Sequence, residues 1–134
     1  MWFITYNKHK EVISLFEIEF YEKADGTAPV KEFLEGLDIK MRAKMLMSIE
    51  LLKYGGYQLR EPYSKSLDDG ILELRAKSGN NISRVLYFFV IGETAVLTNG
   101  FIKKTTKTPK NEIERAKQYR ADYLNRKEHS HDEL

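Results

Sequence analysis

Basic side chains that could handle a phosphodiester gather in the second half of the chain. The segment Lys103–Lys127 holds nine Lys/Arg against three acids, a local net charge of +6. The segment Glu11–Asp38 holds eight acids and two lysines, a local net charge of −6. A chain polarised in this way can present one face to a polyanion and keep another face solvated. The alternative interpretation is that the lysine-rich loop and helix form only a solvated surface.

Two arginines are expected to face each other on neighbouring strands. If Gly79 and Asn80 form the turn of a two-residue hairpin, Arg75 pairs with Arg84 on one side of the sheet. Like charges directly opposite each other are destabilising. An anion or a carboxylate should therefore lie between them, and Glu73 is the internal candidate.

The same sheet face could also gather Tyr63 and Lys65, which precede the first of these strands, and the lysines that follow the last one. RNA cleavage by internal attack needs a base for the 2′-OH proton, cations on the pentavalent phosphate and an acid for the 5′ oxygen. Lys and Tyr can exchange protons when neighbouring cations lower their pKa. Arg binds a phosphate through two donors. This set of residue types therefore suits RNA cleavage without metal or histidine.

Composition limits the other classes of site. The 134 residues predict one domain with a modest core. The sequence has no Cys, which excludes disulfides and thiolate metal sites and fits a reducing compartment. His occurs only at positions 9, 129 and 131, outside the predicted core. The chain start does not resemble a signal peptide, and no apolar stretch reaches the ~20 residues that span a bilayer. We expect a cytoplasmic protein without membrane association, metal or small-molecule cofactor.

The elements that position these residues can be read from periodicity. Alternation of apolar residues predicts a strand at 16–20, and apolar stripes predict helices that begin at Pro29 and after the cap Asp38. A loop is expected over 57–70, strands over 71–76, 82–91 and 94–102, and a last helix up to Lys127 with Thr108 as its N-cap. The central strand should be 82–91, the most apolar run. Residues 1–14 form an extension or an extra strand, 15–127 the domain, and 128–134 a polar, flexible tail. The class is α+β, with helices on one face of a small, mainly antiparallel sheet.

Four motifs in order carry a resemblance to a known family. They are the segments 61–67 (EPYSKSL), 70–75 (GILELR), 84–88 (RVLYF) and 100–109 (GFIKKTTKTP). The chain resembles the HigB-like, phage-derived branch of the RelE/ParE toxin superfamily of type II toxin–antitoxin systems. The resemblance covers about residues 16–127. It implies a RelE/ParE-like fold, with two N-terminal helices packed on a small, mainly antiparallel sheet plus a C-terminal helix.

The resemblance also implies a function and partners. RelE-like toxins cleave mRNA in the ribosomal A site, and a helix-turn-helix antitoxin is encoded beside them. We therefore predict a ribosome-dependent mRNA endoribonuclease, or mRNA interferase, that inhibits translation. Its partners would be the cognate antitoxin, the ribosome and mRNA. The predicted catalytic residues are Lys65, Arg75, Arg84 and Tyr63, and the predicted RNA-binding residues are Lys103, Lys104, Lys107 and Arg60.

Within this prediction the two arginines stabilise the phosphate. Lys65 is the base or an electrostatic partner, and Tyr63 is a base or stacks on an RNA base. Two alternatives share the fold. One is a ParE-like poison of DNA gyrase that is not an enzyme, and the other is an inactive module that binds only the antitoxin.

Overall fold

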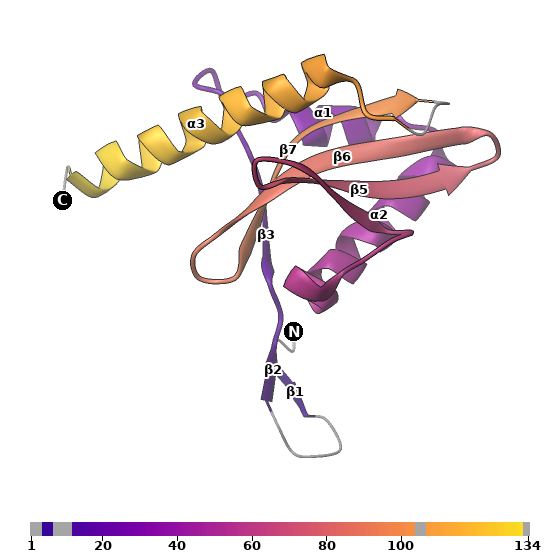
Figure 1. The fold of residues 1–134 in the computed structure, drawn as a ribbon, viewed down its shortest axis with the longest axis horizontal. Helices are drawn as coiled ribbons and strands as arrows, with labels where there is room; N and C mark the ends of the chain where they lie inside the picture. Colours follow the sequence, from indigo (N-terminus) through magenta and orange to yellow (C-terminus); the bar gives the residue numbers. More distant parts are fainter. Residues whose placement is uncertain (1–3, 7–11, 104–106, 133–134) are drawn as a thin grey trace.

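The computed structural model describes residues 4–6, 12–103 and 107–132, and side chains from 15 to 129 within those ranges. The described residues form two β-sheets and three α-helices in an α+β arrangement (Figure 1). The elements are β1 (Ile4–Tyr6), β2 (Val12–Ser14), β3 (Glu17–Phe20), α1 (Pro29–Gly36), α2 (Ile39–Gly55), a short 3-10 helix η1 (Gly56–Gln58), β4 (Ser64–Asp68), β5 (Ile71–Ser78), β6 (Asn81–Val90), β7 (Thr94–Lys103) and α3 (Lys110–Asp132).

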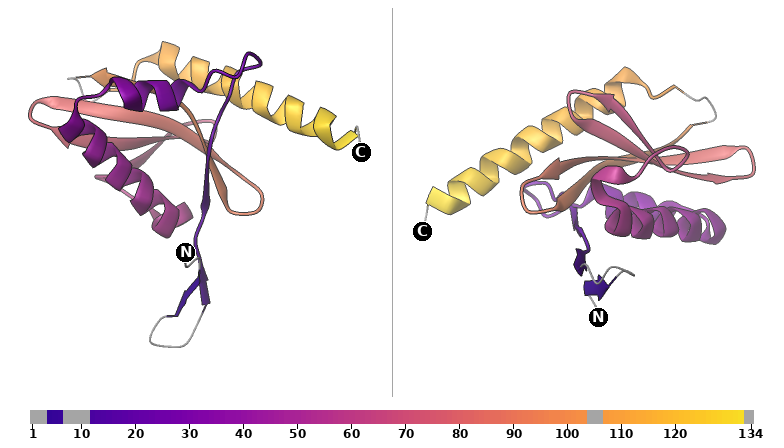
Figure 2. Two further views of the ribbon diagram at one scale, coloured as in Figure 1. Left: turned by 180° about the vertical axis from the view of Figure 1, so that it is seen from behind. Right: turned by 60° about the horizontal axis from the view of Figure 1, so that its bottom comes forward.

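The main sheet has the strand order β3-β7-β6-β5-β4. Strand β3 runs parallel to β7, and the other neighbours are antiparallel. The predicted architecture, two N-terminal helices on one face of a mainly antiparallel sheet, is therefore wrong. One strand of this mixed sheet precedes both helices, four strands follow them, and α3 covers the face opposite α1 and α2 (Figure 2). Alternation in the segment 16–20 identifies a strand, but it contains no information about a partner that lies some 77 residues further along the chain.

The face toward α1 and α2 carries the larger apolar core. Asp38 accepts a hydrogen bond from the Met41 backbone N–H at 2.8 Å, so the predicted cap of α2 is confirmed. The predicted helix stripe is buried here with the inward residues of β5 to β7, namely Met41, Met45, Ile49, Leu52, Leu74, Val85, Tyr87 and Leu97. This core fixes which side of β5 faces away from α2.

The opposite face packs against α3. Its buried apolar residues are Tyr21, Ile71, Leu86, Phe88, Val96, Ala116 and Tyr123. Helix α3 continues to Asp132, beyond the predicted end at Lys127. No helix in the described part of the chain is both long and apolar enough to cross a membrane.

The β5–β6 hairpin has the predicted register. Ser78 pairs with Asn81 across the turn, and Gly79 takes the positive φ of 62° that such a turn requires. Arg75 therefore lies opposite Arg84, as predicted. Strand β6 is central in the sheet, which is also confirmed.

Strand β4 lies in the segment that was expected to be a loop. Its sequence, Ser-Lys-Ser-Leu-Asp, is mostly polar because the strand forms an edge of the sheet, and it therefore gave no strand pattern. In the region expected to be an extension or an extra strand, β1 and β2 form a separate two-stranded sheet that projects from the domain (Figure 1).

Candidate functional site

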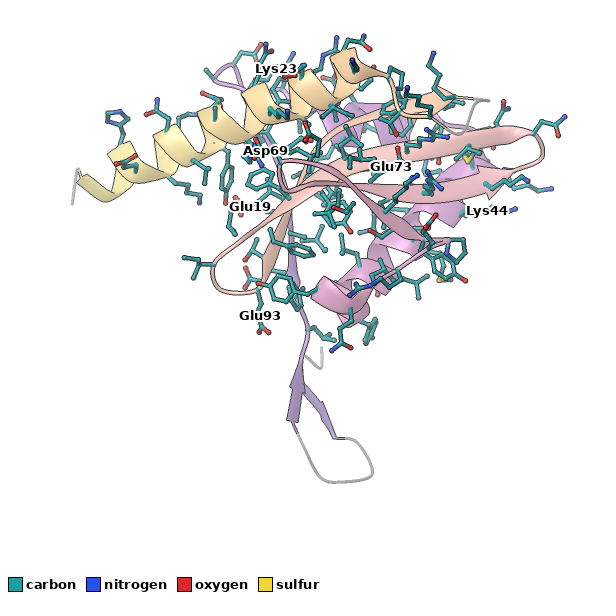
Figure 3. All side chains as sticks on the ribbon, viewed as in Figure 1. Glu19, Lys23, Lys44, Asp69, Glu73 and Glu93 are labelled. Carbon is teal, nitrogen blue, oxygen red and sulfur yellow. The ribbon has the colours of Figure 1, made fainter. Side chains whose placement is uncertain are left out.

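A buried carboxylate holds the two facing arginines. Glu73 on β5 is fully buried, and its Oε2 accepts a hydrogen bond from the Nε–H of Arg75 at 2.5 Å. Its Oε1 lies 3.6 Å from Nη1 of Arg84 and accepts a hydrogen bond from the Thr108 hydroxyl. Figure 3 labels Glu73. The carboxylate expected between the arginines is thus Glu73. Alternation along β5 explains the contact, because residues 73 and 75 share one side of the strand.

Arg84 lies inside this cluster and not on the surface. Its side chain is 0% exposed, and Nη1 donates to Oγ1 of Thr108 at 3.3 Å. Burial lowers the pKa of Arg84, Glu73 raises it, and the repulsion from Arg75 lowers it again. A guanidinium nevertheless keeps its charge in proteins. Arg84 therefore neutralises Glu73 in the interior, and the structure gives it no surface from which to contact RNA directly.

Arg75 reaches the surface from the same cluster. Its side chain is 19% exposed, and its Nη1 lies 3.9 Å from the carboxylate of Glu61, which is 66% exposed. Nε is held by Glu73 and Nη1 lies near the exposed Glu61, and a guanidinium offers paired donors that can bind a phosphate. The predicted phosphate contact by Arg75 is compatible with this geometry.

Thr108 connects the cluster to the basic loop. It is buried two residues before α3, and its hydroxyl bonds to Glu73 while accepting from Arg84. The sequence pattern predicts Thr108 as the N-cap of the last helix. In the structure its hydroxyl bonds to the cluster, so the start of α3 is fixed to the arginine pair.

The other predicted catalytic residues lie on neighbouring edge positions. Lys65 on β4 is exposed and pairs in register with Glu73, which places both on one side of the sheet. Tyr63 is 45% exposed, and its backbone carbonyl accepts the N–H of Arg75 at 2.8 Å. Lys65, Tyr63 and Arg75 are therefore near neighbours at the β4–β5 edge.

The predicted RNA-binding residues have different environments. Lys103 ends β7 and is exposed, as is Lys107, whereas Lys104 lies outside the described residues. The guanidinium of Arg60 donates to the backbone carbonyls of Tyr57 and Leu59 at 2.7 and 3.1 Å, so it also braces its own loop. The structure places Lys103 across β6 from the end of β5, since Ile82 is the register partner of both Lys77 and Lys103.

Sequence reasoning found the arginine pair and Lys65, but it gave Thr108 only a capping role. Nothing in a helix-cap pattern distinguishes a hydroxyl that bonds to its own helix from one that bonds to a distant carboxylate. Glu73 was recognised only as a counter-charge. The sequence alone did not show that Glu73 is completely buried, which depends on how the chain around Thr108 packs and which determines how firmly Arg75 is held.

Comparison with known proteins identifies the family. No curated protein matches the sequence. The family model described as "Phage derived protein Gp49-like (DUF891)" matches residues 32–121, which run from α1 into α3 and include the Glu73 cluster, Lys65 and the basic loop. The match covers more than half of the 134 residues, and the chain therefore belongs to the phage-derived Gp49-like family.

Proposed function

We propose that this protein is the toxin of a type II toxin–antitoxin system and that it cleaves mRNA on the ribosome. The observation that carries the proposal is the charge balance of the Glu73 cluster. One buried carboxylate is shared by two arginines, and the second carboxylate near Arg75, that of Glu61, is 66% exposed and 3.9 Å away, so the positive charge of Arg75, the arginine that reaches solvent, is only partly compensated. A positive, rigidly held donor pair at the surface is suited to an anion that it binds transiently, such as the phosphate of a transition state.

The reaction would be attack by the ribose on its own phosphodiester. The 2′ oxygen bonds to phosphorus while its proton passes to a base, and the bond from phosphorus to the 5′ oxygen breaks. The leaving oxygen takes a proton, and the products are a 2′,3′-cyclic phosphate and a 5′-hydroxyl. Arg75 would stabilise the pentavalent phosphate, and Lys65 or Tyr63 would accept the first proton.

Arg84 has a different role in this proposal from the one that the sequence suggested. It would not touch the phosphate but would act through Glu73, which orients Arg75. The basic residues Lys103 and Lys107, beside the start of α3, would bind phosphates of mRNA or ribosomal RNA.

The resemblance to HigB-like RelE/ParE toxins supports the same proposal, because the quoted motifs 61–67, 70–75 and 84–88 contain Lys65, Arg75 and Arg84. It also supplies the proposed partners, a helix-turn-helix antitoxin and the ribosome, and with them a cytoplasmic location.

The test is single-turnover cleavage of mRNA on programmed ribosomes. Wild-type protein should cut within the coding frame, and a 2′-deoxy substitution at the cut nucleotide should abolish the cut. Arg75→Ala should lose the activity. Lys53→Ala is the control, since Lys53 is a partly exposed cation paired with Glu50 on α2, outside the basic segment 103–127.

Three results would contradict the proposal. Intact mRNA together with trapped DNA–gyrase complexes would identify a gyrase poison. Intact mRNA and DNA together with tight antitoxin binding would identify an inactive binding module. Cleavage that survives the 2′-deoxy substitution would exclude internal attack.

A further inference from the structure

A largely apolar groove runs along the open edge of β5. Strand β4 pairs with β5 only as far as Leu74, so the following residues of β5 pair with β6 on one side and, among the described residues, have no strand on the other side. Helix α2 and the residues before β4 enclose this edge in a groove of about 390 Å³. We call it the edge groove, and its lining residues are Lys44, Met47, Ser48, Leu51, Pro62, Tyr63, Arg75, Ala76, Lys77 and Ile82.

The edge groove combines apolar walls with positive charge. Met47 is 62% exposed and Tyr63 is 45% exposed, so a polarizable thioether and an aromatic ring are both accessible from solvent. Three of the lining residues carry a positive charge, Lys44, Lys77 and Arg75, and none of the lining residues is acidic. An occupant should therefore offer a flat apolar surface together with negative charge.

The backbone of this edge is largely used within the protein. The N–H of Arg75 donates to the carbonyl of Tyr63, and the carbonyl of Arg75 accepts from Ser48 Oγ, both at 2.8 Å. The carbonyl of Lys77 accepts from Lys44 Nζ at 3.1 Å (Figure 3 labels Lys44). A peptide that added a strand here would have to displace these contacts, so the edge groove is a poor site for strand addition.

We propose that the edge groove binds one unpaired base of an RNA strand, next to the phosphate held by Arg75. The proposal rests on the proposed function and deepens it, because it names a base subsite beside the cleavage site. Unpaired bases stack on aromatic side chains, and lysines follow the flanking phosphates. Arg75 connects the two sites: its side chain binds Glu73 on the side of β5 that faces away from α2, and its backbone carbonyl accepts from Ser48 of α2 at the groove. A strand whose phosphate is bound by the guanidinium, and which crosses the open edge of β5, can place a neighbouring base between Tyr63 and Met47.

Methionine methyl groups provide a direct test of binding. In protein labelled with ¹³C at the methionine methyls, Met47 reports on the groove, while Met41 and Met45 are buried at 2% and 0% exposure and serve as internal controls. Triadenylate, and the same trinucleotide with an abasic central position, are the probes. We expect triadenylate to shift the Met47 methyl, the abasic probe to shift it much less, and the two controls to stay in place.

Three results of this titration would overturn the proposal. An equal shift with both probes would show that only phosphates are bound. An unmoved Met47 methyl throughout the titration would show that the groove does not bind RNA. A shift caused by an acidic peptide but not by triadenylate would assign the groove to a protein partner.

A pair of neighbouring variants tests the subsite in the reaction. Met47→Asp places a negative charge in the groove, and Leu46→Asp places the same charge on the adjacent exposed residue of α2, which does not line the groove. We expect Met47→Asp to raise the half-saturating protein concentration for mRNA cleavage about 10-fold, as expected for loss of one stacked base, and Leu46→Asp to change it little. Melting curves should be alike, since both changes put Asp at an exposed position of the same helix.

The two proposals fail separately. If wild-type protein cleaves mRNA and Met47→Asp cleaves with wild-type saturation, the base subsite is wrong and the proposed function stands. If the Met47 methyl responds to triadenylate in a base-dependent way while mRNA stays intact, the subsite stands and the proposed function is wrong.

Discussion

Replacing Glu73 by leucine should expose how much the fold depends on the buried cluster. Arg84 is 0% exposed, and Glu73 is an ionic partner of it in the interior at 3.6 Å. Removing the carboxylate leaves a buried guanidinium beside a second one, Arg75, whose repulsion already lowers the pKa of Arg84. Breaking a buried ion pair by removing one member costs about 3–5 kcal/mol.

That cost converts into a large change in melting temperature. Unfolding entropy is about 2.1 cal/mol/K per residue near 60 °C, and the chain has 134 residues. Glu73→Leu should therefore lower the melting temperature by roughly 11–18 °C. Arg75→Ala should cost much less, because Arg75 is partly exposed and its removal leaves Glu73 paired with Arg84 and Thr108.

A double variant separates charge from shape. Replacing a buried pair by apolar residues of similar volume is often neutral or stabilising, so Glu73→Leu with Arg84→Met should recover most of the stability lost in Glu73→Leu. The assay is urea denaturation of the two single variants and the double variant, followed by the coupling free energy of the cycle. The double variant should still cleave mRNA about 100-fold more slowly than wild type, since Arg75 has lost the acceptor that orients it.

Two outcomes would refute this reasoning. A loss below about 1 kcal/mol in Glu73→Leu would show that the buried charge of Arg84 needs no carboxylate. A double variant no more stable than Glu73→Leu would show that packing or the Thr108 contact, and not charge, accounts for the loss.

Three further predictions follow from single residues. Arg75→Ala should raise the free-energy barrier for cleavage by about 2.7–4 kcal/mol. Arg75→Lys should restore little of the lost rate, because an ammonium lacks the paired planar donors. Single-turnover cleavage rates of both variants and wild type measure these effects. The pKa of Asp122 is lowered first by the hydrogen bond from the Tyr21 hydroxyl, 2.6 Å away, and then by Arg126. The ionised carboxylate of Asp122 therefore stabilises the fold above the unfolded pKa of about 3.9. This contribution is lost as pH falls through the folded pKa. The stability advantage of wild type over Asp122→Asn should accordingly shrink in melting curves below about pH 4. Gly56→Ala should lower stability by roughly 1–3 kcal/mol in urea denaturation, because a Cβ at φ 51° would overlap the ring of Phe16.

Local patterns predicted the parts of the fold that local chemistry determines. The turn residues Gly79 and Asn80 set the β5–β6 register, and Asp38 with the methionine stripe set α2, so the opposition of Arg75 and Arg84 followed from the sequence. Strand β3 was recognised, but its parallel pairing with β7 was not, because pairing across the whole sheet depends on long-range packing and not on alternation.

The sequence predicted which residues belong to the candidate site, but not how deeply each of them is buried. Arg75 and Arg84 look alike in the sequence, since each lies in an apolar strand with the same alternation. Arg84 is fully buried and bonds to Thr108, whereas Arg75 is partly exposed, and that difference divides the roles. The contact that distinguishes the two members of the pair comes from a residue more than twenty positions further along the chain.

The repulsion between the two arginines supports a functional role for Arg75. Glu73 and Arg84 already balance each other, so stability alone would favour a neutral residue at position 75. Arg75 instead adds a positive charge that disfavours the ionised form of Arg84. The nearby Glu61 is 66% exposed and 3.9 Å away, so water weakens its compensation. A bound phosphate would relieve this repulsion. Because a ligand that binds only the folded protein stabilises it, added phosphate should raise the melting temperature of wild type and not that of Arg75→Ala.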